Sequence, residues 1–269
     1  MHFETVCLDE KRPHVTLTTY VADVKTPVRP AMLVIPGGGY GCVCSGREGE
    51  PIAAAFLARG FNAFVLHYSV GAQITHPYEP LCDAALAMKH IRDSADAYAI
   101  DPHKVYAVGF SAGGHLTGSL GTMWKDAQIK ENCGVSPETC RPDGVVLCYP
   151  VISADESFGH IGSFKNLLRD RFGDETLTAR FSLEKRVESD SAPAFLVHTA
   201  EDAVVPVKNS LAFAEKMAKA GVLCELHMYP KGPHGMALAT SDTNIGQAAF
   251  TDSAYAHWVD DACAFLKRI

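Results

Sequence analysis

A series of short, almost continuously apolar runs, separated by longer amphipathic stretches, constrains the fold more than any other feature of this sequence. Strands that are buried on both faces have this composition, and the intervening stretches have the spacing of helices, so the pattern predicts an α/β protein whose mostly parallel sheet is covered by helices. The first run, His14–Tyr20, alternates polar and apolar residues, as an antiparallel edge strand does. The predicted strands are His14–Tyr20, Ala31–Ile35, Ala63–Tyr68, Val105–Phe110, Val145–Tyr149, Ala194–Thr199 and Cys224–Tyr229, and the predicted helices are Ile52–Arg59, Glu79–Ala97, Gly113–Trp124, Val207–Ala220 and Ala254–Lys267.

One stretch interrupts this alternation. The 269 residues fit one large domain, 1–269, in which about forty residues between Ser153 and Ser191 separate two predicted strands. This stretch is rich in charged residues and in Phe, Gly and Ser. An insertion of that length between core strands predicts a lid or substrate-binding element at about 153–191, with a simple packing excursion as the alternative.

The composition narrows the classes of partner. The formal net charge is -7, from 24 basic and 31 acidic residues without a long run of either sign, which argues against binding to a nucleic-acid backbone. The nine cysteines, of which Cys42 and Cys44 are nearest in sequence, form no C-x-x-C pair and predict reduced thiols. No signal peptide and no apolar run of about 20 residues is visible, so we expect a cytoplasmic protein without a membrane partner. The sequence leaves the oligomeric state open.

The strongest local motif is Gly109-Phe-Ser-Ala-Gly113, which follows the apolar run Val105–Phe110 and opens a predicted helix. A nucleophilic serine on a tight strand-to-helix turn needs small residues two positions before it and two after it. The helix that follows directs its positive end and its free N–H groups at the reacting centre. We therefore predict Ser111 as a nucleophile.

A second glycine-rich turn, Pro36-Gly-Gly-Gly-Tyr40, ends an earlier apolar run. Consecutive glycines let backbone N–H groups approach a ligand oxygen, such as the oxyanion of a tetrahedral intermediate. We predict the N–H groups of Gly38, Gly39 and Ala112 as the oxyanion hole. A phosphate-binding loop is the alternative, but the Gly-Lys-Ser/Thr that it requires is missing.

The base and the acid are predicted from their positions after strands. Among the 12 histidines, His234 lies on a Gly/Pro-rich loop just beyond the last predicted strand. A serine needs such an imidazole to accept its proton. We expect His115 to point away from the serine into packing, and His198 to be a hydrogen-bonded core histidine.

For the acid, Glu201 and Asp202 both follow the strand Ala194–Thr199. We predict Asp202, with Glu201 ranked second, as the carboxylate that would hold the imidazole in the correct tautomer. The resulting chain order of serine, aspartate and histidine is the order of the Ser-Asp-His hydrolases that carry the serine on a strand-to-helix turn.

These motifs give the sequence a family resemblance. It resembles bacterial α/β-hydrolase esterases of the acetylxylan-esterase-like group, which are related to hormone-sensitive-lipase-like carboxylesterases. The resemblance implies the α/β-hydrolase fold and hydrolysis of small esters, often acetyl groups on xylan-derived oligosaccharides imported into the cytoplasm, without a cofactor. Pro36 departs from the lipase-like relatives, which have histidine before the glycines. The matching motifs are Pro36–Tyr40, Ser45–Ile52, Gly109–Leu116, Tyr149–Ile152, His160–Ser163 and Lys231–Met236.

Three alternatives remain open at this stage. An arylformamidase-like amide hydrolase would use the same turn and triad on a formamide. A non-catalytic binding protein on the same scaffold would have lost a reactive residue, yet all the predicted ones are present. A zinc-dependent sugar deacetylase would need a ligand cluster, and the sequence has no H-E-x-x-H or C-x-x-C motif. We therefore expect neither a metal nor another cofactor.

Overall fold

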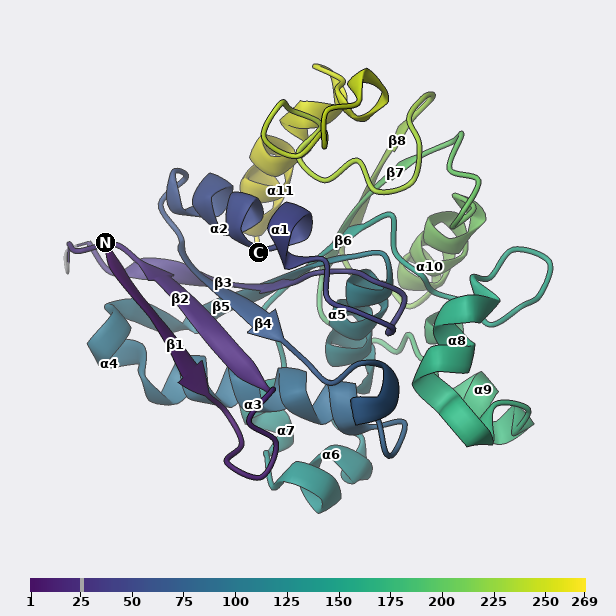
Figure 1. Ribbon diagram of the computed structural model, residues 1–269, viewed down its shortest axis with the longest axis horizontal. Coiled ribbons are helices and arrows are strands. Elements are labelled where there is room, and N and C mark those ends of the chain that lie inside the picture. The colour runs from purple at the N-terminus through teal and green to yellow at the C-terminus, as the bar shows by residue number, and fades with distance from the viewer. Residues whose placement is uncertain (25–26) are drawn as a thin grey trace.

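The computed structural model describes residues 1–24 and 27–269 of the chain. An eight-stranded sheet with the order β1-β2-β4-β3-β5-β6-β7-β8 runs through the middle of the molecule (Figure 1). Strands β3 to β8 pair in parallel, which confirms the predicted α/β class and mostly parallel sheet. The strands are β1 (His2–Cys7), β2 (Thr16–Val21), β3 (Arg29–Ile35), β4 (Asn62–His67), β5 (Ile100–Phe110), β6 (Val145–Cys148), β7 (Ala194–Thr199) and β8 (Cys224–Tyr229).

The antiparallel end of the sheet differs from the prediction. Strand β2 is antiparallel to its neighbours, as predicted for the His14–Tyr20 run, but its predicted edge position is wrong. Strand β1 pairs along its outer side, from His2 opposite Val21 to Cys7 opposite Thr16. None of the residues of β1 is fully buried, so the strand lacks the apolar signal that identifies the inner strands.

Helices cover both faces of the sheet (Figure 1). Helices α3 (Glu79–Asp93), α5 (Ala112–Met123) and α10 (Lys208–Lys219) contribute to one apolar core, and α2 (Glu50–Leu57) and α11 (Trp258–Leu266) contribute to the other. Shorter helices join them: α1 (Ser45–Glu48), α4 (Ala95–Tyr98), α6 (Ala127–Cys133), α7 (Pro137–Cys140), α8 (Ile161–Leu168) and α9 (Glu175–Arg180). In these described residues no helix is both long and apolar enough to cross a membrane.

Two predicted helices are shorter in the structure. The helix predicted over Glu79–Ala97 is interrupted at Ser94, whose φ of −99° and ψ of 16° are not helical. The helix predicted from Ala254 begins only at Trp258. A 3-10 turn precedes it, in which the carboxylate of Asp252 accepts hydrogen bonds from the N–H groups of residues 254 and 255. Short polar side chains that bond to nearby backbone compete with helix formation in this way.

The segment 153–191 contains α8 and α9 and packs beside the glycine turn that follows β3. Phe164 and Leu167 of α8 join the core on the α5 face of the sheet. On the same helix, Asn166 donates a hydrogen bond from Nδ2 to the carbonyl oxygen of Gly39, at 2.8 Å. The segment is therefore anchored next to the predicted oxyanion hole, and its role as a lid is still a prediction.

Candidate active site

Ser111 occupies the tight turn between β5 and α5. Its φ of 53° and ψ of −117° lie in a region that non-glycine residues rarely adopt, at a cost of about 1–3 kcal/mol. The flanking glycines explain how the turn closes. A Cβ atom at Gly109 would lie 2.1 Å from Oγ1 of Thr117, and one at Gly113 would lie 2.2 Å from the carbonyl oxygen of Ile35. The G-x-S-x-G spacing thus follows from close packing around the serine.

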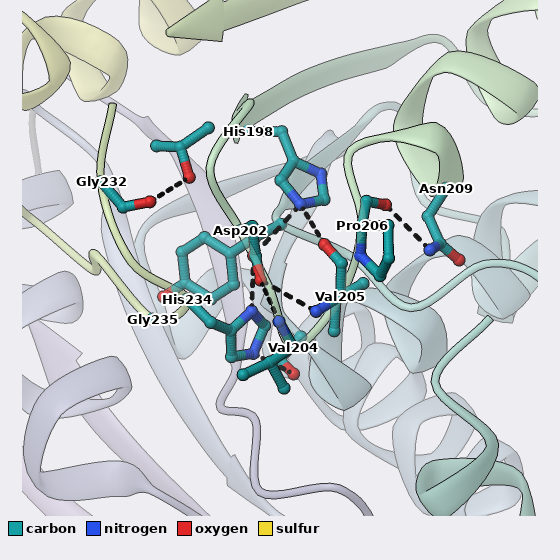
Figure 2. A network of polar contacts seen from close by, with 12 residues as sticks. His198, Asp202, Val204, Val205, Pro206, Asn209, Gly232, His234 and Gly235 are labelled. Atoms are coloured by element: carbon teal, nitrogen blue, oxygen red, sulfur yellow. Dashed lines mark hydrogen bonds and ion pairs between the residues drawn. The ribbon is translucent and has the colours of Figure 1, made fainter. Parts of the chain in front are cut away.

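Three loops at the carboxyl edge of the sheet bring the predicted serine, histidine and aspartate together. Nε2 of His234 lies 2.9 Å from Oγ of Ser111, and Nδ1 lies 2.7 Å from Oδ2 of Asp202 (Figure 2 shows the second contact). Because Asp202 can only accept when ionised, these partners favour the tautomer with the proton on Nδ1. Nε2 is then free to accept a proton from the serine hydroxyl.

The carboxylate of Asp202 is buried and fully hydrogen-bonded. Its Oδ1 accepts the backbone N–H groups of Val204 and Val205 at 3.0 and 2.8 Å, and its Oδ2 accepts from His234 and also from Nε2 of His198, at 3.2 Å (Figure 2). Burial alone would raise the pKa of Asp202, but the hydrogen bonds from His198, His234 and Val205 hold this pKa well below its usual range. The group is therefore an anion at neutral pH.

The histidines and the carboxylate that were ranked lower have other environments. His198 is buried and its Nδ1 lies 2.8 Å from Oγ of Ser210, as expected of a core histidine, although its contact with Asp202 is not foreseen by the sequence. His115 bonds to the hydroxyl of Tyr40 and the carbonyl oxygen of Phe181, and burial lowers its pKa to about 4, so it is a neutral packing residue. Glu201 is exposed to solvent.

The glycine turn proposed as the oxyanion hole has backbone angles that favour glycine. Gly38 and Gly39 have φ values of 128° and 63°, which glycine adopts without strain. The carbonyl oxygen of Gly38 accepts the N–H groups of residues 41 and 42, which fixes the turn. In the part of the chain that the structure describes, no acceptor bonds to the N–H of Gly38, Gly39 or Ala112. In the described residues these three N–H groups are therefore not paired with a protein acceptor.

Helix α1 contributes two residues that the sequence analysis did not identify. Oε2 of Glu48 accepts the N–H of Gly37 at 2.8 Å, and Oε1 accepts the hydroxyl of Tyr149 at 2.7 Å. The guanidinium of Arg47 donates to the carbonyl oxygen of Thr243 at 2.9 Å and to that of Gly235, directly after the predicted base. The resemblance of Ser45–Ile52 to one group of esterases was the only signal in the sequence for these contacts.

Among the described residues, no group of three or more His, Cys, Asp or Glu side chains is arranged to hold a metal ion. The predicted absence of a cofactor stays a prediction. What the site provides is a hydroxyl, an imidazole, a buried anion and three free N–H donors, which together can perform acyl transfer.

A model of the BD-FAE family matches residues 17–217, which is more than half of the chain. This range includes the predicted nucleophile and acid and ends before the predicted base.

Two similar proteins are larger than this chain. Endo-1,4-beta-xylanase B of Butyrivibrio fibrisolvens is 42% identical over 226 residues, which make up 82% of this chain and 34% of that protein. Acetylxylan esterase of Xylanibacter ruminicola is 33% identical over 221 residues, 80% of this chain and 43% of that protein. The chain therefore spans less than half the length of each.

Solved structures match over nearly the whole chain. The acetyl ester-xyloside bifunctional hydrolase from Caldicellulosiruptor lactoaceticus has a TM-score of 0.80 and 35% identity, covering 97% of this chain and 96% of that one. The carboxylesterase Cest-2923 from Lactobacillus plantarum has a TM-score of 0.84 and 27% identity, covering 100% and 98%. Together with the family match, these similarities show that the chain belongs to the BD-FAE family and is an acetylxylan-esterase-like α/β hydrolase.

Proposed function

We propose that this protein hydrolyses esters of short acyl groups, acetyl above all, on xylan-derived oligosaccharides. The observation that carries the proposal is the hydrogen-bonded series from Ser111 through His234 to Asp202, with the serine on a strained turn beside three free N–H donors. The names of similar proteins support the substrate class, since they include an acetylxylan esterase and an acetyl ester-xyloside hydrolase.

The proposed reaction has two stages. In the first, Nε2 of His234 accepts the proton of Ser111 while Oγ attacks the ester carbonyl carbon. The carbonyl oxygen becomes an oxyanion, which accepts hydrogen bonds from the N–H groups of Gly38, Gly39 and Ala112. The protonated imidazole is stabilised by the anionic Asp202. It then donates its proton to the ester oxygen of the sugar as the bond between that oxygen and the acyl carbon breaks, so that the sugar leaves as an alcohol and an acyl-enzyme remains.

In the second stage water replaces the sugar. The same imidazole accepts a proton from the water, whose oxygen attacks the acyl carbon, and returns that proton to the serine oxygen as the acid departs. The products are a carboxylic acid and the original enzyme. No step requires a metal or an organic cofactor.

The test combines site variants with a substrate series. Ser111→Ala and His234→Ala should each lower kcat by at least about 10³-fold while the protein stays folded, and the double variant should lose no more than either single one. A fluorophosphonate probe should label the wild type and not Ser111→Ala. Turnover by His234→Ala at the wild-type rate would contradict the assigned base.

The substrate series decides between acyl groups. We expect faster turnover of p-nitrophenyl acetate than of butyrate to octanoate esters, and release of acetate from acetylated xylo-oligosaccharides. A maximum at hexanoyl or octanoyl would contradict the acetyl preference. N-formylkynurenine tests the formamide alternative, and a chain that neither hydrolyses esters nor reacts with the probe would be a binding protein.

A further inference from the structure

Glu48 is a buried carboxylate next to the proposed active site and has no cation bonded to it in the described residues. Only 5% of its surface is exposed. Its oxygens accept instead from two neutral donors, the N–H of Gly37 and the hydroxyl of Tyr149. Burial raises the pKa of Glu48, and these two hydrogen bonds oppose that effect. Burial of a carboxyl group that has no cation bonded to it costs stability, so its presence calls for a role beyond packing.

The first partner directly precedes two residues of the proposed oxyanion hole. Gly37 directly precedes Gly38 and Gly39, and its N–H donates a hydrogen bond to Oε2 of Glu48. The approach is so close that a Cβ atom at Gly37 would lie 2.8 Å from Oε2 of Glu48. The carboxylate therefore fixes the backbone from which the two donor N–H groups extend.

The second partner contacts the loop of the proposed base. The hydroxyl of Tyr149 donates to Glu48 and accepts the N–H of Ala237, at 3.1 Å. Its ring also packs edge to face against the ring of His234, with centroids 5.1 Å apart and an angle of 73°. Tyr149 has a φ of 37°, an unfavourable value for a tyrosine, so the surrounding contacts hold it in this position.

We propose that Glu48 is a positioning residue of the ester hydrolysis, which through Tyr149 sets the oxyanion turn and the His234 loop at one fixed distance from each other. Both oxygens of its carboxylate act as acceptors, one toward each loop. This inference rests on the proposed function, because it explains how the proposed oxyanion donors and the base His234 keep their relative positions. It does not place Glu48 in contact with the substrate.

The test is Glu48→Gln. Glutamine keeps the shape but offers one acceptor oxygen, so its NH₂ group faces either the N–H of Gly37 or the hydroxyl of Tyr149. We expect kcat for p-nitrophenyl acetate to fall about 10- to 100-fold with KM changed less than about twofold, because misplacement of reacting groups acts on the transition state. Affinity for a small alkyl boronic acid, which mimics the tetrahedral intermediate, should fall with kcat.

Tyr149→Phe is the second variant, since it removes only the hydroxyl and preserves the ring against His234. It should show the same separation of kcat from KM, and the Glu48→Gln/Tyr149→Phe double variant should lose no more than the worse single variant. This second variant also serves if Glu48→Gln does not fold.

Tyr78→Phe is the matched control. Tyr78 is another buried tyrosine whose hydroxyl bonds to a buried carboxylate, Asp126, at 3.2 Å, and neither contacts the proposed triad. The Tyr78→Phe variant should have a lower melting temperature than the wild type and an unchanged kcat. Wild-type kcat and boronate affinity in folded Glu48→Gln and Tyr149→Phe would overturn the positioning role. An inactive, unlabelled wild type would overturn the proposed function instead.

Discussion

Replacement of Asp202 by asparagine tests the proposed site through the tautomer of one imidazole. The two carboxylate oxygens of Asp202 have different surroundings: Oδ1 accepts two backbone N–H groups, and Oδ2 accepts from His234 and His198. In Asp202→Asn the amide oxygen must stay with the two backbone N–H donors. If the NH₂ group faced them instead, both hydrogen bonds would be lost, at about 1–3 kcal/mol each. The NH₂ group then faces His234.

This orientation of the amide affects proton transfer from Ser111, the proposed nucleophile. His198 can still donate to the carbonyl oxygen of Val205, at 2.9 Å, so it does not oppose this orientation. Nδ1 of His234, however, now faces a donor and must accept, which moves the ring proton to Nε2. That nitrogen points at Oγ of Ser111 and can no longer accept its proton. We expect kcat to fall about 10³- to 10⁴-fold, or about 4–5.5 kcal/mol in the activation barrier, with KM nearly unchanged.

Steady-state hydrolysis of p-nitrophenyl acetate measures this effect, and Glu201→Gln provides the control. Glu201 is the neighbouring carboxylate, exposed to solvent, so its amide variant should keep nearly full activity. A fall of less than about tenfold in Asp202→Asn would refute the tautomer argument. A large loss of kcat in Glu201→Gln, with little loss in Asp202→Asn, would indicate that Glu201 and not Asp202 is the acid.

Three further predictions concern packing, pH and metal removal. Gly113→Ala should lower the free energy of unfolding in urea by about 1–3 kcal/mol, because its Cβ would meet the backbone oxygen of Ile35; Gly46→Ala, with no atom within 4 Å of its Cβ, should not. Since its folded-state pKa is lowered, Asp202 adds stability that is present above the usual aspartate pKa of about 4 and is lost as the pH falls through the folded-state pKa. Urea titrations between about pH 7 and pH 3 should therefore show a smaller loss for Asp202→Asn than for the wild type; equal slopes would contradict this. Dialysis against EDTA should leave esterase activity unchanged, because in the proposed mechanism the imidazole activates both the serine and the water; loss of activity that zinc restores would indicate a metal mechanism.

The sequence predicts the inner strands well, because a strand that is buried on both faces is a nearly continuous apolar run. The inner strand β7 begins and ends at the predicted residues, as does the edge strand β8, whereas the other predicted strands differ at their ends. Strand β1 could not be found in this way, since its pairing with β2 depends on backbone hydrogen bonds and buries little apolar surface. Whether a strand lies at an edge depends on what pairs with it, which periodicity does not encode.

For the site, a residue could be predicted where it stands in a recognisable motif or directly after a predicted strand. The G-x-S-x-G turn is local, so the surroundings of Ser111 could be anticipated from five consecutive residues. Glu48 could not, because it lies in the charged run Arg47-Glu-Gly-Glu50, which has the composition of a solvated surface. Its burial arises only when α1 packs between two loops, and its partner Tyr149 is 101 positions away in the sequence. His234 is even further from Ser111 in the sequence, but it lies in a Gly/Pro-rich loop after a strand, whereas no comparable motif marks Glu48.

The order of the three proposed residues along the chain has a consequence for biosynthesis. The strand-to-helix turn with Ser111 leaves the ribosome first, Asp202 follows, and His234 comes after the last strand of the sheet. In the proposed mechanism, a nascent chain that had already formed the turn would still lack its base, and we expect no ester hydrolysis from a polypeptide released before β8. Under the proposed mechanism, activity should therefore appear only after the segment that follows β8 has been synthesised and folded against the sheet, so ester hydrolysis reports on elongation past His234.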